Sequence, residues 1–250
     1  KANSYKITYN ANQPVGSSGT VTGATEISIH TYDESKKLSL NGYVLKGYTF
    51  LGWALNSSAK IVDYIDQADA LNLADTDGAE VILYAIWKAN TYTILYDSNI
   101  PSTASGKISG TTESSTHTYD ELKGLTLNGY SLIGWTFIGW SKTANGSVVY
   151  ENTEEVENLS SVENGTVTLY AVWKANVYAI SFDTVGGSFT EAVSATYDSA
   201  LSSIVIPTRK GYNFKGFYTE NGGNGIEYFD ADGNSSIKYN LTNDVKLYAY

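Results

Sequence analysis

Histidine is the side chain best suited to proton transfer near neutral pH, and the sequence contains two. His30 and His117 stand at equivalent places in a repeated His-Thr-Tyr-Asp stretch, whose third occurrence has Ala195 in that place. A catalytic triad or a zinc site would need partner residues at set spacings, and the sequence has neither a cysteine nor a further histidine. We expect both histidines to be structural polar residues near strand ends.

Carboxylates also recur at equivalent places. Asp33, Asp120 and Asp198 each follow a tyrosine directly. Paired carboxylates can carry out acid–base chemistry on glycosides. However, an aspartate that precedes a short polar run with leucines is also typical of a helix N-cap, which needs no substrate. The sequence favours the capping role.

Three glycine-containing stretches could hold an ion. Those at 75–78 and 230–234 resemble the start of a calcium loop, but neither has the remaining oxygen ligands or the closing glutamate. The stretch at 222–225 lacks the lysine and the helix of a phosphate loop. Turns explain all three, so we expect no metal, no cofactor and no enzymatic activity.

Aromatic residues carry the one serious functional alternative, because exposed Trp and Tyr stack on sugar rings and anchor protein interfaces. A seven-residue motif with the pattern Gly-aromatic-x-Phe-x-Gly-aromatic occurs at 47–53, 134–140 and 211–217. It is either a ligand platform presented three times or a core strand of a module that occurs three times.

Strand alternation divides this motif into two faces. Phe50 lies on one face, and every copy has Phe there, so this face is expected to meet the core. Leu51 and Trp53 lie on the other, which holds Lys215 in the third copy and is therefore expected to be partly wet. Trp53 and Trp140 are thus the candidate ligand contacts, although covering a sheet or a module junction is the favoured role. The motif's glycines indicate a bulge or a close backbone approach.

The whole chain repeats, and not only this motif. A Lys-Ala-Asn opening, a Thr-Tyr-Asp stretch and a closing Leu-Tyr-Ala run return three times in the same order. We divide the chain into modules at 1–87, 88–173 and 174–250. Links of four residues join them, so we expect restricted mutual orientation and an elongated array. Modules of ~80 residues are also expected to gain stability from their neighbours.

The third module is shorter in one loop. Tyr5 to Tyr32 spans 27 positions, whereas Tyr178 to Tyr197 spans 19, so eight residues are missing after the first strand. Length changes of this kind concentrate in surface loops.

Alternating Tyr, Ile, Val and Thr residues predict four strands in the first module, at 5–10, 25–32, 47–55 and 80–87. A short helical segment is expected after Asp33, between the second and third strands. A helical turn is also expected within 61–80, and in the third module an Asp-Gly hairpin turn within 225–240. This order predicts an α+β, mostly β fold made of three β-grasp-like modules.

Composition limits the partners. The net charge is −10 and no cluster of Lys or Arg occurs, which argues against nucleic acid and anionic membranes. No apolar run approaches the ~18 residues of a membrane span, and the first residues do not show a charged stretch followed by an apolar one. We interpret the sequence as an internal piece of a longer chain or a trimmed product. A cysteine-free, Thr/Tyr/Asn/Gly-rich β sequence suits a bacterial surface protein.

The Tyr-Asp pair, the G-Y-x-F-x-G-W motif and the L-Y-A-x-W ending together resemble the Listeria–Bacteroides repeat, also called the internalin B-repeat. The resemblance covers essentially the whole chain in three copies, and the third departs from it at Phe217 and Tyr250. It implies small β-grasp-like modules in tandem, in secreted or wall-attached bacterial surface proteins, with no general catalytic activity.

We therefore expect a non-enzymatic, extracellular repeat region that is attached to the bacterial surface through other parts of its protein. Its expected role is that of a spacer or stalk, with a part in adhesion. The alternative is a module that binds a host glycan or a host or bacterial surface protein through exposed aromatic residues. We expect a monomer without nucleic-acid partners.

Overall fold

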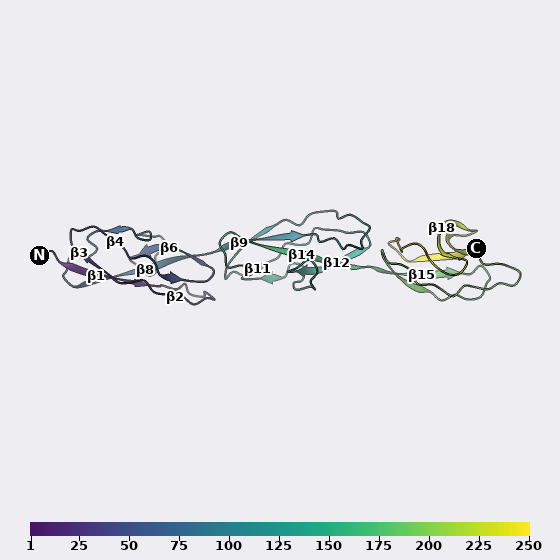
Figure 1. The fold of residues 1–250 in the computed structure, drawn as a ribbon, viewed down its shortest axis with the longest axis horizontal. Helices are drawn as coiled ribbons and strands as arrows, with labels where there is room; N and C mark the ends of the chain where they lie inside the picture. The colour runs from purple at the N-terminus through teal and green to yellow at the C-terminus, as the bar shows by residue number, and fades with distance from the viewer. The chain divides into compact units, whose positions relative to one another are not determined.

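The computed structural model describes residues 1–250 as strands, turns and loops, with no helix (Figure 1). The chain forms two compact units. Unit 1 comprises Lys1–Leu95, Ser114–Leu125 and Glu154–Val167, and unit 2 comprises Tyr96–Glu113, Thr126–Thr153 and Thr168–Tyr250. The boundary between the units falls inside the middle repeat, because each end of that repeat makes contacts with its neighbour. Modules 1, 2 and 3 below are the repeats 1–87, 88–173 and 174–250.

Module 1 is a four-stranded sheet with the strand order β3-β1-β8-β6. The central pair, β1 and β8, is parallel, and both outer pairs are antiparallel. Two short ladders, β2–β5 and β4–β7, pair residues of the segments that connect these four strands. The strands are β1 (Ser4–Asn10), β2 (Thr22–Gly23), β3 (Ser28–Thr31), β4 (Lys36–Lys37), β5 (Tyr43–Val44), β6 (Tyr48–Ala54), β7 (Asp69–Ala70) and β8 (Ala79–Ala89).

Module 2 repeats most of these strand pairs, and the β2–β5 ladder is reduced to an isolated bridge between Ser109 and Ser131. In unit 1, β9 pairs with β10 and β11 with β13; in unit 2, β12 pairs with β14. The strands are β9 (Thr91–Asp97), β10 (Ser115–Thr118), β11 (Lys123–Gly124), β12 (Trp135–Ser141), β13 (Glu155–Val156) and β14 (Gly165–Ala175).

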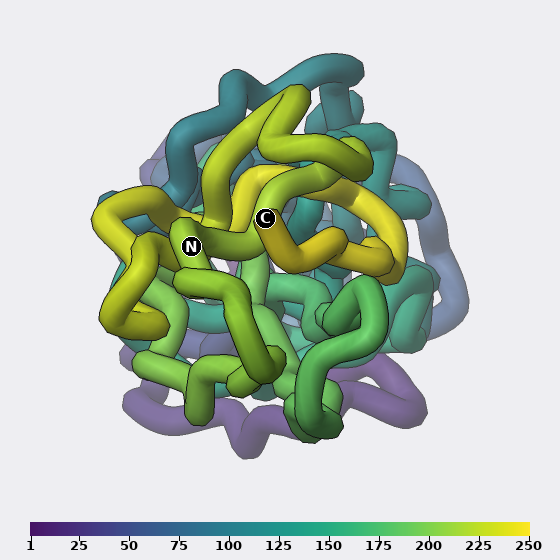
Figure 2. Tube along the Cα trace, turned by 90° about the vertical axis from the view of Figure 1, so that its right-hand side faces the viewer, coloured from purple at the N-terminus to yellow at the C-terminus, as the bar shows by residue number.

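Module 3 has a five-stranded sheet with the order β16-β15-β19-β17-β18. The C-terminal end of the chain lies centrally among its green and yellow loops in Figure 2. The extra strand β18 pairs with β17 through a turn at 221–223, and the expected Asp-Gly turn follows β18 without starting a new paired strand. The strands are β15 (Val177–Asp183), β16 (Val193–Thr196), β17 (Gly216–Glu220), β18 (Asn224–Asp230) and β19 (Val245–Ala249).

The expected helical segments are wrong, and with them the α+β class and the β-grasp order; a mostly β repeated module is correct. Asp33 does not cap a helix but lies in a turn with φ +63°, whereas an N-cap residue has β-region dihedrals. The following lysines form β4, and Leu38 turns into the core with 2% exposure. The stretch 61–80 forms turns and β7 instead of a helical turn.

A β-bulge determines which side chains of β6 reach the core. The register of β6 against β8 shifts between Phe50 and Gly52, so strict alternation is broken and Trp53 joins Phe50 on the core side. Their rings lie 4.9 Å apart, and Tyr9 packs 4.7 Å from the indole. Gly52 is required because a Cβ there would lie 2.5 Å from the carbonyl oxygen of Tyr64. The predicted role of this glycine as a bulge is confirmed.

The closing strand alternates as far as Ala85, and the next residue, Ile86, is buried as well. Leu83 and Ala85 are buried, and Val81 and Trp87 pack against the same cluster. On the other face, Ile82 is 41% exposed.

Candidate functional site at the module junctions

The predicted ligand contacts, Trp53 and Trp140, have no exposed surface at all. Trp140 lies in the equivalent aromatic cluster of module 2, with Phe137 at 4.9 Å and Tyr96 at 4.8 Å. An indole needs a free face to stack on a sugar. Neither residue offers one, so ligand contact has no support at these two positions, and the rings fill the cores of their modules.

Both histidines are fully buried in strands. His30 Nε2 lies 3.0 Å from Ser28 Oγ, and its ring stacks on Tyr5 with centroids 5.6 Å apart. Burial and, second, the charge of Lys36 lower the pKa of His30, so the neutral ring is favoured. No group of three or more His, Cys, Asp or Glu side chains could hold a metal ion.

The aspartate of the second module binds the module before it. Ser18 donates its backbone N–H to Asp120 Oδ2 (2.9 Å) and its hydroxyl to Asp120 Oδ1. Tyr48 donates its hydroxyl to Oδ2 (3.0 Å). Asn158, from module 2 itself, donates to Oδ1 (2.8 Å). Both carboxylate oxygens are therefore bonded from both sides of the boundary, and the whole contact lies within unit 1.

The serine–aspartate contact recurs at the next boundary, within unit 2, without the bond from an asparagine. Ser105 donates its N–H to Asp198 Oδ2 (2.9 Å) and its hydroxyl to Oδ1. Trp135 takes the place of Tyr48 and donates Nε1 to Oδ2 (3.2 Å). Since tyrosine and tryptophan both carry an N–H or O–H at the ring edge, the exchange keeps the donor.

Electrostatics keep these carboxylates charged. Burial alone would raise the pKa of Asp120, but the hydrogen bonds from Ser18, Asn158 and Tyr48 outweigh it and leave the pKa below its usual value. Burial followed by the hydrogen bond to Asp120 raises the pKa of Tyr48 to about 12. An ionised acceptor makes each of these hydrogen bonds stronger than a neutral one.

A glycine and a tyrosine form the second part of each junction. Gly47 has φ +79°, and a Cβ there would lie 2.1 Å from the ring of Tyr119. Gly134 has φ +75° and would meet Tyr197 at 2.2 Å. Both positions therefore need glycine for its dihedrals and for space.

The four-residue link completes the junction through its asparagine. Asn90 donates its N–H to Gly47 O (2.8 Å), and its side-chain oxygen accepts the hydroxyl of Thr49 (2.6 Å). On the other side, its carbonyl accepts Tyr119 N–H (2.9 Å) and its Nδ2 donates to Ser161 O (2.8 Å). The link is thus built into both modules.

The next link repeats most of this pattern. Asn176 donates its N–H to Gly134 O (2.9 Å) and accepts the hydroxyl of Thr136 (2.6 Å). Its carbonyl accepts Tyr197 N–H (2.9 Å). Sequence reasoning recognised that the links are short but missed this asparagine.

Sequence reasoning also missed Ser18 and Ser105, and it assigned their aspartate partners to helix caps. One signal pointed to them: both serines lie in the loop that the third module shortens.

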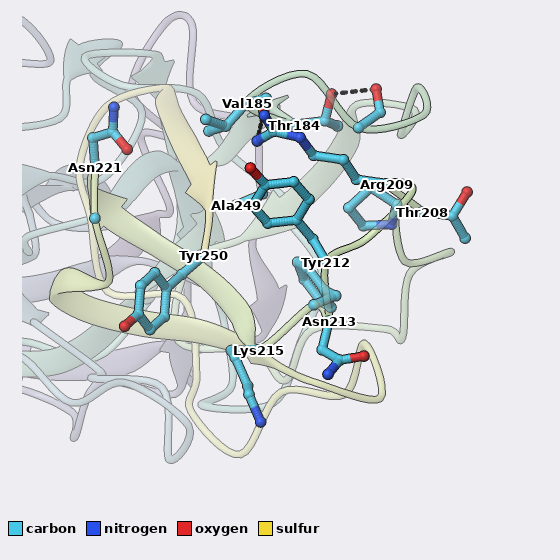
Figure 3. A pocket seen from close by; sticks show the side chains of 14 residues that line it. Thr184, Val185, Thr208, Arg209, Tyr212, Asn213, Lys215, Asn221, Ala249 and Tyr250 are labelled. Atoms are coloured by element: carbon cyan, nitrogen blue, oxygen red, sulfur yellow. Dashed lines mark hydrogen bonds between the residues drawn. The ribbon is translucent and has the colours of Figure 1, made fainter.

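Module 3 contains a cavity of about 410 Å³ (Figure 3). Thr184 and Phe214 line it. At the equivalent place of module 1 lies Trp87, whose Nε1 donates to Ala11 O (2.8 Å) and whose ring contacts Phe50 at 5.6 Å. Thr184 and Phe214 occupy the repeat positions of Ala11 and Phe50. The cavity therefore lies where the indole of the closing strand packs in module 1, and we assign it no ligand.

Repeated small β modules with an equivalent contact at each boundary define a tandem-repeat protein. A family model described as the Listeria-Bacteroides repeat domain matches residues 5–86, 92–172 and 178–250. The chain therefore belongs to the Listeria-Bacteroides repeat domain family, as the sequence motifs indicated.

Relatives occur in Evansella cellulosilytica. One, named "Putative Gly-rich membrane protein", is 30% identical over 178 residues, which make up 70% of this chain and 19% of that protein. Another, named "Putative membrane protein", is 42% identical over 66 residues, or 26% of this chain and 9% of that protein. The chain thus spans less than a fifth of the length of these relatives. None of its own segments forms a helix that could cross a membrane.

Proposed function

We propose that the chain is a non-enzymatic repeat region of a bacterial surface or secreted protein, and that it acts as a spacer. The observation that carries this proposal is the equivalent serine–aspartate contact at both module boundaries, at Asp120 and Asp198. Two hydrogen bonds from one serine, a ring-edge donor and a bonded link leave little freedom for rotation at a boundary. A spacer needs this restraint, whereas an enzyme or a single binding site does not.

The family and the relatives support the location. The two relatives carry the word membrane in their names, and they are several times longer than this chain. We infer that the repeats project from a surface to which other parts of the protein attach them. Adhesion through loops that differ between the modules, such as the loop after the first strand, is part of the proposal. The partner would be a host glycan or a surface protein.

Spin labels test the restraint. The chain has no cysteine, so Lys60→Cys in module 1 and Glu157→Cys in module 2 give a single pair of exposed label sites. A restrained boundary gives a narrow distance distribution, and Ser18→Ala or Asp120→Asn broadens it. A broad distribution in the chain with an intact junction would refute the spacer role.

A separate assay addresses adhesion and catalysis. The chain, carrying a fluorescent label, is applied to a glycan array and to immobilised host surface proteins. It is also incubated with glycan and peptide substrates to detect turnover. Binding without turnover supports adhesion, no binding leaves the spacer as the whole function, and turnover would overturn the non-enzymatic proposal.

A further inference from the structure

Module 1 carries the acceptor half of a junction in the same form as module 2 does at Asp120. Asp33 has φ +63°, against +60° at Asp120. Asn72 accepts the N–H of Asp33 (2.6 Å) and donates to its Oδ1 (2.8 Å), and Asn158 makes both bonds to Asp120 at the same distances. The carboxylate is thus held in position by its own module.

The residues around Asp33 match as well. Asn3 O accepts Tyr32 N–H (2.8 Å), and Asn3 Nδ2 donates to Asp75 O (2.7 Å), as the link asparagine Asn90 does in module 2. Ser4 N–H donates to Asp77 (2.9 Å), as Thr91 does to its own acidic partner. The beginning of module 1 is therefore folded as a link.

What differs is the other side of the contact. Asp33 is exposed, and no serine or ring-edge donor reaches its carboxylate. Tyr32 is half-buried, whereas Tyr119 and Tyr197 are 5% and 6% exposed beneath their glycines. The N–H and side-chain oxygen of Asn3, which in the two later links bond a glycine carbonyl and a threonine hydroxyl, have no partner.

We propose that Asn3, Tyr32 and Asp33 form a docking face for the serine-loop end of another copy of this repeat. The copy's serine would bind Asp33 through its N–H and hydroxyl, its glycine would cover Tyr32, and its threonine would bond Asn3. Each of these contacts is present twice in the chain, at Asp120 and at Asp198. The docking face therefore matches the end of another repeat.

Module 3 cannot bind this docking face, because its own end lacks the residues that make the contact in modules 1 and 2. Its first loop lacks the eight residues that would include the serine, and Asn213 replaces the threonine. At Gly211 an added Cβ meets nothing within 4 Å, and Tyr212 is 66% exposed. The occupant must therefore be a copy with an intact serine loop, such as module 1 or module 2.

The inference extends the proposed spacer function and is tested by placing a copy of residues 1–87 directly before the 250-residue chain. Lys1, Ala2 and Asn3 then serve as the link, as they do at 88–90. Amide hydrogen exchange is measured in β1 and β3 of the original module 1. We expect protection to rise about tenfold or more when the copy docks.

Asp33→Asn in the original module 1 should abolish this gain in protection, and so should Ser18→Ala in the added copy. The two substitutions together should have no larger effect than either one alone. Glu34→Gln removes a neighbouring exposed charge and should leave the gain intact. In the 250-residue chain without the copy, Asp33→Asn should change protection less than twofold, which also shows that the variant folds.

No gain in protection, or equal losses from Asp33→Asn and Glu34→Gln, would overturn the docking face. The spacer proposal is judged separately by Asp120→Asn, whose effect does not involve Asp33.

Discussion

Ser18 binds both carboxylate oxygens of Asp120, which lies 102 residues further along the chain. Ser105 and Asp198 repeat the arrangement at a separation of 93 residues. A backbone N–H and a hydroxyl on one residue, directed at two oxygens of one carboxylate, fix direction as well as distance. The loss of this contact should therefore weaken a module boundary.

Replacing Asp120 by Asn should lower the free energy of unfolding by about 1–3 kcal/mol, because one charged oxygen becomes an amide that faces the donors of Ser18 and Tyr48. Urea denaturation monitored by tryptophan fluorescence measures the change. Asp33→Asn is the matched control, since it makes the same substitution in the same turn without a neighbouring module, and its cost should stay within about 0.5 kcal/mol. Equal costs for the two variants would contradict the role of the junction.

Replacing Gly134 by Ala should destabilise the chain more than replacing Gly211 by Ala. Both glycines have positive φ, +75° and +82°, so both variants pay about 1–2 kcal/mol for the backbone. Only at Gly134 does the added methyl group meet a ring, that of Tyr197 at 2.2 Å, which should add about 1–3 kcal/mol. Thermal denaturation of both variants isolates this difference, and identical melting temperatures would show that the tyrosine is not held against the glycine.

The sequence predicted the repeated modules and most of their long strands, because period-2 alternation survives in β1, β3 and β8. It failed at β6, where one bulge moves Trp53 to the core side, and no local pattern distinguishes a bulged strand from a regular one apart from Gly52. It failed again at Asp33, because an aspartate before a polar run with leucines suits both a helix cap and a left-handed turn.

The junctions could not be predicted for a different reason. Ser18 and Asp120 belong to different copies and are far apart in sequence, so no motif contains both. The repeat shows what each copy shares, and a contact between copies becomes visible only once the modules are folded.

Replacing Val185 by Asn should stabilise module 3. Val185 has φ +50°, which a β-branched residue adopts at a cost, whereas Asn12 and Asn99 hold the equivalent position in the other modules at +42° and +43°. Asn12 also donates its Nδ2 to Ala85 O (2.9 Å). In module 3 the equivalent acceptor for the new asparagine is Ala249 O. We expect a gain of about 1–2 kcal/mol by urea denaturation. Val185→Gly relieves the backbone alone and separates the two contributions; a loss of stability in both variants would contradict the argument.

Protonation of the buried histidines should make the chain less stable in weak acid. Burial, followed by the charges of Lys36 and Lys123, lowers the pKa of His30 and His117 in the folded chain below 6.5. As the pH falls below about 6.5, the unfolded chain binds protons that the folded chain rejects, so the free energy of unfolding decreases until the folded pKa is reached. Urea midpoints measured between pH 7.5 and about 5 should therefore decline.

The double variant His30→Ala/His117→Ala should flatten this decline, even though it is less stable at pH 7.5 through the loss of packing. Alanine is compatible with the position, because Ala195 occupies it in module 3 with 1% exposure. The junction carboxylates Asp120 and Asp198 do not contribute in this window, since hydrogen bonding that outweighs their burial keeps each pKa below 3.8. An unchanged slope in the double variant would show that other groups take up the protons.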